Sequence, residues 1–346
     1  MKTREINSYT SNRKTNINYM IFGAVIAILP LLNGFGIIQS STMTILGTVM
    51  FYSIVAMGLT ILLGFSGLVS LGTAGFMGLG SYMAAYFTED MKLPFLLSLL
   101  ISVLVPVIIG VLVGLVSLRI EGYYLAIATL AVSEIIRRLF DIDKFTHGYS
   151  GKNGNYPIIF GLELDKSYTF ILITIVLVLI MILSNNFLNA QTGRALLAMK
   201  GSEAAAQAMG INLLKYKLTA FGIATLYASL GGVLYNHFVN YTYPDTWNLL
   251  LSLNFIGIII IGGMRSLSGA VLGTFIVFGF PELVLKEIPG IANIDGLQYV
   301  MSGVFLIIII LFYPGGAINI FKDIKDTSKK VLQKILKKPQ EAEVGS

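Results

Sequence analysis

The chain has 346 residues, of which 55% are apolar and only 12% are charged, and it contains no cysteine. This composition excludes a water-soluble globule of ordinary size, and the lack of cysteine excludes disulfides, thiolate metal sites and cysteine nucleophiles. The net charge of +6 does not indicate a nucleic-acid partner, because it is concentrated in residues 1–18, residues 187–217 and the tail after Asn319, as in proteins whose basic loops stay in the cytoplasm.

Apolar runs long enough to cross a bilayer recur along the chain. We therefore expect an all-α, polytopic transmembrane helical bundle of about ten membrane segments. The expected segments are residues 19–38, 43–63, 67–88, 94–118, 122–139, 168–186, 214–236, 248–263, 267–287 and 297–313.

The charge pattern predicts the orientation of these segments. With an even number of spans and a basic amino terminus inside, both termini and residues 187–213 are expected in the cytoplasm. The chain is then divided into a cytoplasmic amino terminus (1–18), a transmembrane domain (19–316) and a basic cytoplasmic tail (317–346).

The third expected segment is unusually rich in glycine, with six glycines between Gly64 and Gly80. Such a sequence favours a broken or re-entrant helix, which membrane proteins tolerate beside protein or a water-lined path. The stretch GLVSLGTA at Gly67–Ala74 is echoed by GMRSLSGA at Gly263–Ala270, so internal duplication, parallel or inverted, is one interpretation. We expect the following residues to serve the translocation path or close helix packing: Gly67, Ser70, Gly72, Gly75, Gly263 and Ser266.

Candidate catalytic chemistry is sparse. Glu134 is the one well-placed carboxylate within an expected span, and Arg137 and Arg138 follow on the same helical face. Ion pairing and a proton relay are the two interpretations of this group. The sequence HGYSGKN resembles a phosphate-binding loop but lacks its first glycine and its final hydroxyl. We expect no catalytic or metal site and no cofactor in this chain.

The segment from Thr192 to Phe221 contains the pattern of a short capped helix. Ser202 can cap its start, Glu203 complements the positive helix end, and Gly210 supplies a left-handed stop. A helix of two turns has little stability of its own in water, so we expect a partner surface to order it. The alternative is a connector that packs on its own protein.

Four blocks of sequence resemble the permease family of high-affinity branched-chain amino acid ABC importers, of the LivM type. They occur in the family order and are spread over nearly the whole membrane part. The blocks are GLVSLGTAGFMGLGSY (67–82), RIEGYYLAIATLAVSEIIR (119–137), GRALLAMKGSEAAAQAMGIN (193–212), and IIIIGGMRSLSGAVLG (258–273) with FYPGG (312–316).

The resemblance implies a permease subunit in the bacterial plasma membrane that has no enzymatic activity itself. Its implied partners are a second homologous permease, two cytoplasmic ATPases that bind ATP and Mg, an extracytoplasmic amino-acid-binding protein and the lipid bilayer. Residues 187–213 would then be the coupling segment, with its contacts to the ATPase made by Ser202, Glu203, Ala204, Ala205 and Gly210. In the family pattern the glycine follows the glutamate by six residues, whereas Gly210 follows Glu203 by seven.

Three other functions remain as alternatives. Similar permeases import urea or short amides, and these share the same class of mechanism. An ion-coupled secondary transporter would need buried carboxylates, for which Glu134 alone gives thin support. A membrane-embedded enzyme would need a cluster of polar catalytic residues within the spans, and the sequence contains none.

Overall fold

A computed structural model of the chain describes residues 12–36, 38–117, 123–142, 146–159, 161–284, 297–313 and 315–319. The described residues are mostly helical, as expected for the all-α class. The longer helices are α1 (Asn12–Ala27), α3 (Ser40–Leu59), α4 (Thr73–Ala85), α5 (Phe95–Ser117), α6 (Tyr123–Ile142), α7 (Lys166–Asn189), α8 (Gln191–Gly201), α10 (Leu213–Val239), α11 (Leu249–Gly262) and α14 (Leu297–Phe312).

The other elements are shorter. The short helices are α2 (Leu29–Gly34), α9 (Glu203–Ala208), α12 (Leu267–Thr274) and α13 (Phe280–Val284), and π-helical turns occur at η2 (Thr60–Phe65), η3 (Tyr86–Asp90) and η6 (Phe275–Gly279). Four two-residue strands form two antiparallel pairs: β1 (Lys152–Asn153) pairs with β4 (Tyr241–Thr242), and β2 (Ile158–Ile159) pairs with β3 (Leu162–Glu163).

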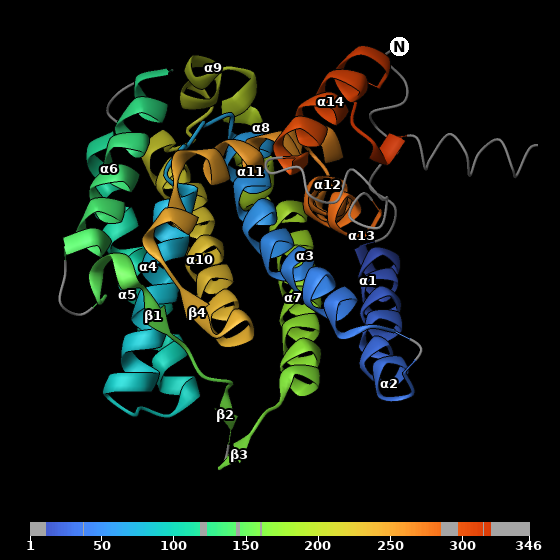
Figure 1. The fold of residues 1–346 in the computed structure, drawn as a ribbon. Coiled ribbons are helices and arrows are strands. Elements are labelled where there is room, and N and C mark those ends of the chain that lie inside the picture. Colours follow the sequence, from blue (N-terminus) through green and yellow to red (C-terminus); the bar gives the residue numbers. More distant parts are fainter. Residues whose placement is uncertain are drawn as a thin grey trace, which may run out of the picture.

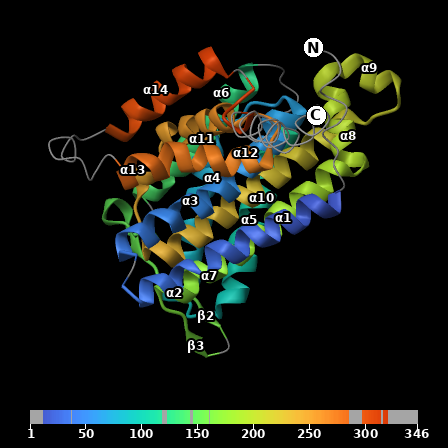
Figure 2. The same ribbon diagram turned by 90° about the vertical axis from the view of Figure 1, so that its right-hand side faces the viewer.

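Helices α3, α4 and α10 form the centre of the bundle (Figures 1 and 2). Every residue of the α3–η2 helix from Val49 to Leu62 is buried, which is typical of a helix that is apolar all round. Helix α9 lies at one end of the bundle and strands β2 and β3 lie at the other (Figure 1). We call these two ends the α9 end and the β2–β3 end.

Helix α5 has the surface expected of a helix that faces lipid. Its exposed face is a stripe of large apolar side chains at every fourth position, 53–59% exposed, formed by Leu96, Leu100, Leu104, Ile108 and Leu112. Its buried face has the small residues Ser98, Ser102, Pro106, Gly110 and Gly114 at the same spacing. Large apolar residues outside and small residues between helices are typical of membrane helices. The chain is therefore a multi-pass membrane protein.

The expected count of ten spans is not confirmed. Among the described residues, six segments are long and apolar enough to cross a membrane by length and composition. They are Lys14–Gly34, Ser40–Phe65, Phe95–Ser117, Lys166–Asn189, Leu213–Val239 and Leu267–Val284.

The other four expected spans are helices that fall short of this criterion for two physical reasons. Helices α11 and α14 have 14 and 16 residues, so they measure about 21–24 Å against about 30 Å of hydrocarbon. Helix α4 continues through η3 to Asp90, but this end carries Glu89 and Asp90, which lower its hydropathy. Helix α6 is long enough but carries Glu134, Arg137, Arg138 and Asp141.

The first expected segment, residues 19–38, differs from the structure at both ends. Helix α1 begins already at Asn12, and a second short helix, α2, follows a break at Ile28. Pro30 at the start of α2 explains the break, because proline lacks the amide hydrogen that would continue α1. Most of the predicted amino-terminal segment (residues 1–11) and of the basic tail (residues 320–346) lies outside the described residues.

Candidate functional site

Helix α9 has the local structure that its sequence predicts. Ser202 Oγ accepts a hydrogen bond from the Ala205 amide at 3.3 Å, which caps the start of the helix. At the other end Gly210 adopts a left-handed φ of 82°. The Gly210 and Ile211 amides donate to the carbonyl oxygens of Gln207 and Ala206, at 2.9 and 3.1 Å. This is a Schellman motif, and it confirms the predicted left-handed stop.

The surface of α9 is almost entirely free within the described chain. Ala206 is buried, and the other five residues of the helix are exposed. Glu203 forms an ion pair of 2.6 Å with Lys217, whose side chain is largely buried at the start of α10. The helix therefore projects from the α9 end while one ion pair and one buried alanine attach it to the bundle. The predicted docking role of Ser202–Gly210 stays a prediction.

The glycine-rich segment contains the predicted break. Gly67 has a φ of 79°, and residues 67–72 are not helical before α4 begins at Thr73. The start of α4 leaves backbone amides without partners inside its own helix. Hydroxyl groups satisfy two of them: Ser252 accepts from Ala74 and Ser133 from Gly75, each at 3.0 Å. In the break itself Thr129 accepts from the Leu71 amide, also at 3.0 Å.

Close packing accompanies this capping. Ser70 Oγ accepts from the Gly72 amide at 3.2 Å. A side chain at Gly75 would come within 2.6 Å of Ser133 Oγ, and one at Gly72 within 3.0 Å of the Thr129 carbonyl oxygen. Both glycines are thus in direct contact with α6, and a methyl group at Gly75 does not fit unless α6 shifts.

Sequence reasoning missed the three hydroxyls that accept from the Leu71, Ala74 and Gly75 amides. Thr129 and Ser133 are four residues apart and so lie on one face of α6, which was the available signal. Nothing in the sequence marks Ser252, because it caps α4 from a helix almost 180 residues away.

Replacement of Ser133 by alanine should destabilise the protein by about 1–3 kcal/mol, because the buried Gly75 amide would lose its acceptor. The change is measurable as a lower midpoint of unfolding in detergent solution. Ser41→Ala is a matched control, because Ser41 is exposed and bonds only Gln39 nearby. Equal midpoints for the two variants would contradict the capping role.

The segment Gly263–Ala270, whose sequence echoes Gly67–Ala74, forms a second break of the same kind. Gly263 has a φ of 117°, and Ser266 caps α12 by accepting from the Gly269 amide at 3.0 Å. A side chain at Gly263 would come within 3.0 Å of the Gly315 carbonyl oxygen, so the break packs against the Gly315–Gly316 turn. Both breaks are followed by a helix that passes into a π-helical turn, α4–η3 and α12–η6.

The two breaks meet at the α9 end. A side chain at Gly64 would overlap the Met264 carbonyl oxygen, and both α3–η2 and α11 end at this point. The end of η2, just before the first GxxSLxxA segment, therefore packs against the start of the second one. That they arose by duplication remains a prediction.

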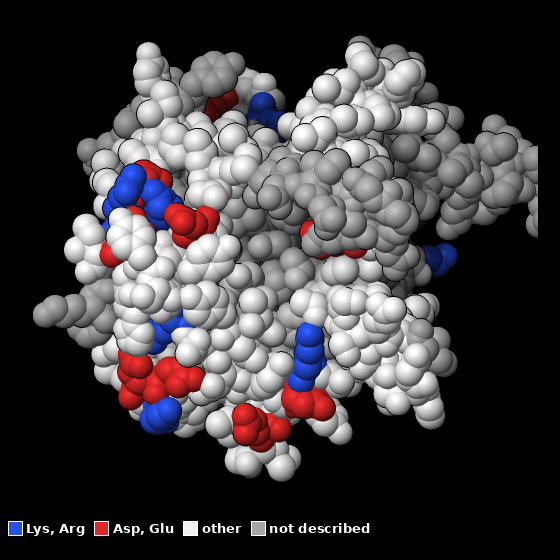
Figure 3. All heavy atoms as spheres, in the orientation of Figure 1, with Lys and Arg blue, Asp and Glu red and all other residues white. Residues whose placement is uncertain are grey.

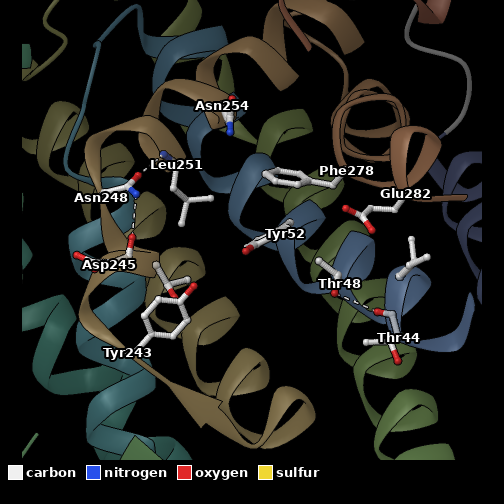
Figure 4. A pocket seen from close by; sticks show the side chains of 12 residues that line it. Thr44, Thr48, Tyr52, Tyr243, Asp245, Asn248, Leu251, Asn254, Phe278 and Glu282 are labelled. Carbon is white, nitrogen blue, oxygen red and sulfur yellow. Dashed lines mark hydrogen bonds between the residues drawn. The ribbon is translucent and has the colours of Figure 1, made fainter. Parts of the chain in front are cut away.

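A polar cavity of about 360 Å³ opens among α3, the start of α11 and the η6–α13 region (Figure 4). Its volume lies in the range of small-molecule sites. The residues that line it are Thr44, Ile45, Thr48, Tyr52, Tyr243, Asp245, Thr246, Asn248, Leu251, Asn254, Phe278 and Glu282. None of the six glycines and serines predicted for the path is among them.

The chemistry of this cavity suits a small amphipathic solute. Figure 4 shows Tyr52, Tyr243 and Glu282, from three different elements, around one space. Beside the cavity, Lys166 Nζ donates to Thr44 Oγ1 at 2.5 Å, so a positive charge lies next to the Thr44 hydroxyl that lines it. Apolar surface comes from Ile45, Leu251 and Phe278. Cations, anions and a short apolar chain can each find a complementary group here.

The charged group predicted on α6 is an ion-pair network. Glu134 bonds Arg137 at 2.7 Å and Arg138 at 3.2 Å, and Arg137 also lies 3.6 Å from Asp245. Figure 3 shows these basic and acidic side chains gathered on the surface over α6. The ion-pairing interpretation of Glu134 is confirmed. Within the described residues no group of three or more histidine, aspartate and glutamate side chains is arranged to hold a metal ion.

Comparison with known proteins identifies relatives over most of the chain. Residues 41–312 match the family described as "Branched-chain amino acid transport system / permease component". The chain is 26% identical over 305 residues to the high-affinity branched-chain amino acid transport system permease protein LivM of Escherichia coli K12, covering 81% of this chain and 70% of the relative. It is 27% identical over 307 residues to LivM of Salmonella typhimurium LT2, covering 81% and 69%. No solved structure matches the chain.

Proposed function

Because this chain belongs to the family of permease components of branched-chain amino acid transport systems, we propose that it forms half of the membrane pore of an ATP-driven importer for leucine, isoleucine and valine. A second, homologous permease forms the other half. Two cytoplasmic ATPases dock on Ser202–Gly210 of this chain and on the matching segment of its partner, and an external binding protein delivers the amino acid.

The observation that carries this proposal is the geometry of α9. A two-turn helix with two capped ends and an almost fully exposed surface has the form of a docking element for another protein, because only a partner can supply the burial that it lacks. The α9 end is then the cytoplasmic end of the bundle. The β2–β3 end faces the binding protein.

The polar cavity supports a path for amino acids. It is lined by the first half of α3 and the start of α11, so it lies toward the β2–β3 end, where the substrate enters in this scheme. Carboxylates suit the α-ammonium group of an amino acid, and hydroxyls with nearby Lys166 suit its carboxylate. The aliphatic side chain would contact the apolar lining residues.

Uptake of labelled leucine by cells that express the complete transport system tests the proposal. Uptake should persist when a protonophore dissipates the ion gradient, in cells that retain ATP, and should stop when ATP is depleted. The opposite pattern would favour an ion-coupled transporter. An excess of unlabelled valine or isoleucine should compete with leucine, whereas urea and acetamide should not; competition by the amides alone would favour the short-amide alternative.

A further inference from the structure

Lys200 connects the coupling segment to the first glycine break. It lies in the last turn of α8, two residues before the cap of α9. Its Nζ donates to the carbonyl oxygens of Leu63 and Gly64, at 3.2 and 2.8 Å. These oxygens belong to the last turn of the α3–η2 helix, where carbonyl groups have no partner within their own helix. A cation at this position also complements the negative end of the helix.

The stem of Lys200 lies directly against the break. A side chain at Gly67 would come within 3.3 Å of Lys200 Cγ, and Gly67 already needs its left-handed backbone. Burial lowers the pKa of Lys200 below its usual value, and the charge of Arg265 lowers it further. The two carbonyl partners of Lys200 therefore hold its ammonium group close to the positive charge of Arg265, which lies in the second break.

The position of these contacts allows a movement of α8 to reach both breaks. Gly64 packs against the Met264 backbone of the second break, so the carbonyls that Lys200 binds lie where both breaks meet. The first break leads directly into α4, whose start is capped by hydroxyls from α6 and α11. A displacement of α8 therefore acts where α3–η2 and α11 end and both breaks begin.

We propose that Lys200 is a positioning residue for transport, which transmits movement of α9 to the break at Gly64–Gly67 by capping the α3–η2 helix in one state and releasing it in the other. The inference rests on the proposed function, because it requires an ATPase on α9. It adds a specific contact through which the nucleotide cycle reaches the pore, beyond docking itself. Such a switch needs two alternative arrangements of a packed element rather than gradual deformation.

The test uses the complex purified through a tag on this chain and reconstituted with its binding protein. Lys200→Met should reduce leucine transport at least tenfold while ATP hydrolysis stays within about twofold of wild type, so that fewer molecules move per ATP. Lys200→Arg keeps the charge and the donors and should retain at least a third of the transport. Lys215→Met is the matched control, because Lys215 is an exposed lysine in the first turn of α10, just after the coupling segment, and it should transport normally.

A second readout follows the break itself. The chain has no cysteine, so Leu68→Cys introduces a single thiol beside Gly67. Its rate of maleimide labelling should change when ATP is added to the otherwise unaltered complex, and this change should disappear with Lys200→Met. Elution as a single species controls for folding, and Lys200→Gln replaces the methionine variant if that protein does not accumulate.

The outcomes separate the inference from the proposed function. Normal transport by Lys200→Met, or an equal loss of transport and ATP hydrolysis, would overturn the role of Lys200 and leave the function intact. A wild-type complex that does not transport leucine would overturn the function. In that case labelling of the thiol at position 68 still decides whether Lys200 relays the ATP signal: a response that survives Lys200→Met overturns the relay.

Discussion

Replacement of Gly210 by alanine should reduce ATP-driven leucine uptake about tenfold. Alanine in a left-handed conformation costs roughly 1–2 kcal/mol, and Gly210 has a φ of 82° in the Schellman motif that ends α9. Because α9 has only six residues, it is only marginally stable by itself, and this cost is enough to unfold it. A loss of about 1.4 kcal/mol in docking free energy corresponds to a tenfold weaker complex with the ATPase.

The measurement is uptake together with the amount of ATPase that co-purifies with the tagged permease. Gly201→Ala is the control variant. Gly201 also has open space where a side chain would begin and lies in the same exposed segment, but it ends the regular helix α8 without a left-handed φ. We expect uptake within twofold of wild type for this control. A Gly210→Ala protein that binds the ATPase and transports normally would remove the docking role from α9.

Replacement of Gly232 by alanine should prevent stable folding of the bundle, at a cost of about 3 kcal/mol, the upper end for overpacking. Gly232 lies where α10 crosses α4, and a side chain there would overlap the Met77 carbonyl oxygen. The same crossing brings Gly80 onto the backbone of Ser229. Backbone rather than a movable side chain is the obstacle, so the helices must separate.

The expected result is a large decrease in the yield of monodisperse protein and a lower midpoint of thermal unfolding in detergent. Gly222→Ala supplies the matched control from the same helix, since its nearest neighbour is a Val111 methyl group at 3.5 Å, an ordinary contact. Alanine also forms helix better than glycine, by about 1 kcal/mol, so Gly222→Ala should be neutral or stabilising. If both variants unfold at the same midpoint, the close crossing of α10 and α4 is wrong.

Several features were accessible from the sequence because they depend on neighbours along the chain. Composition and the length of apolar runs define the membrane class, since both follow from the transfer of side chains into lipid. The cap at Ser202, the stop at Gly210 and the pairing of Glu134 with Arg137 each lie within a few turns of one helix. The glycine break at residues 67–72 also follows from local composition.

The tertiary structure alone decided which distant groups meet. Lys200 bonds carbonyl groups 136 and 137 residues away, and Ser252 caps α4 across 178 residues. The polar cavity combines side chains from three separate parts of the chain. Local propensities act over a few residues, whereas these sites depend on how helices pack, and packing is a property of the whole bundle.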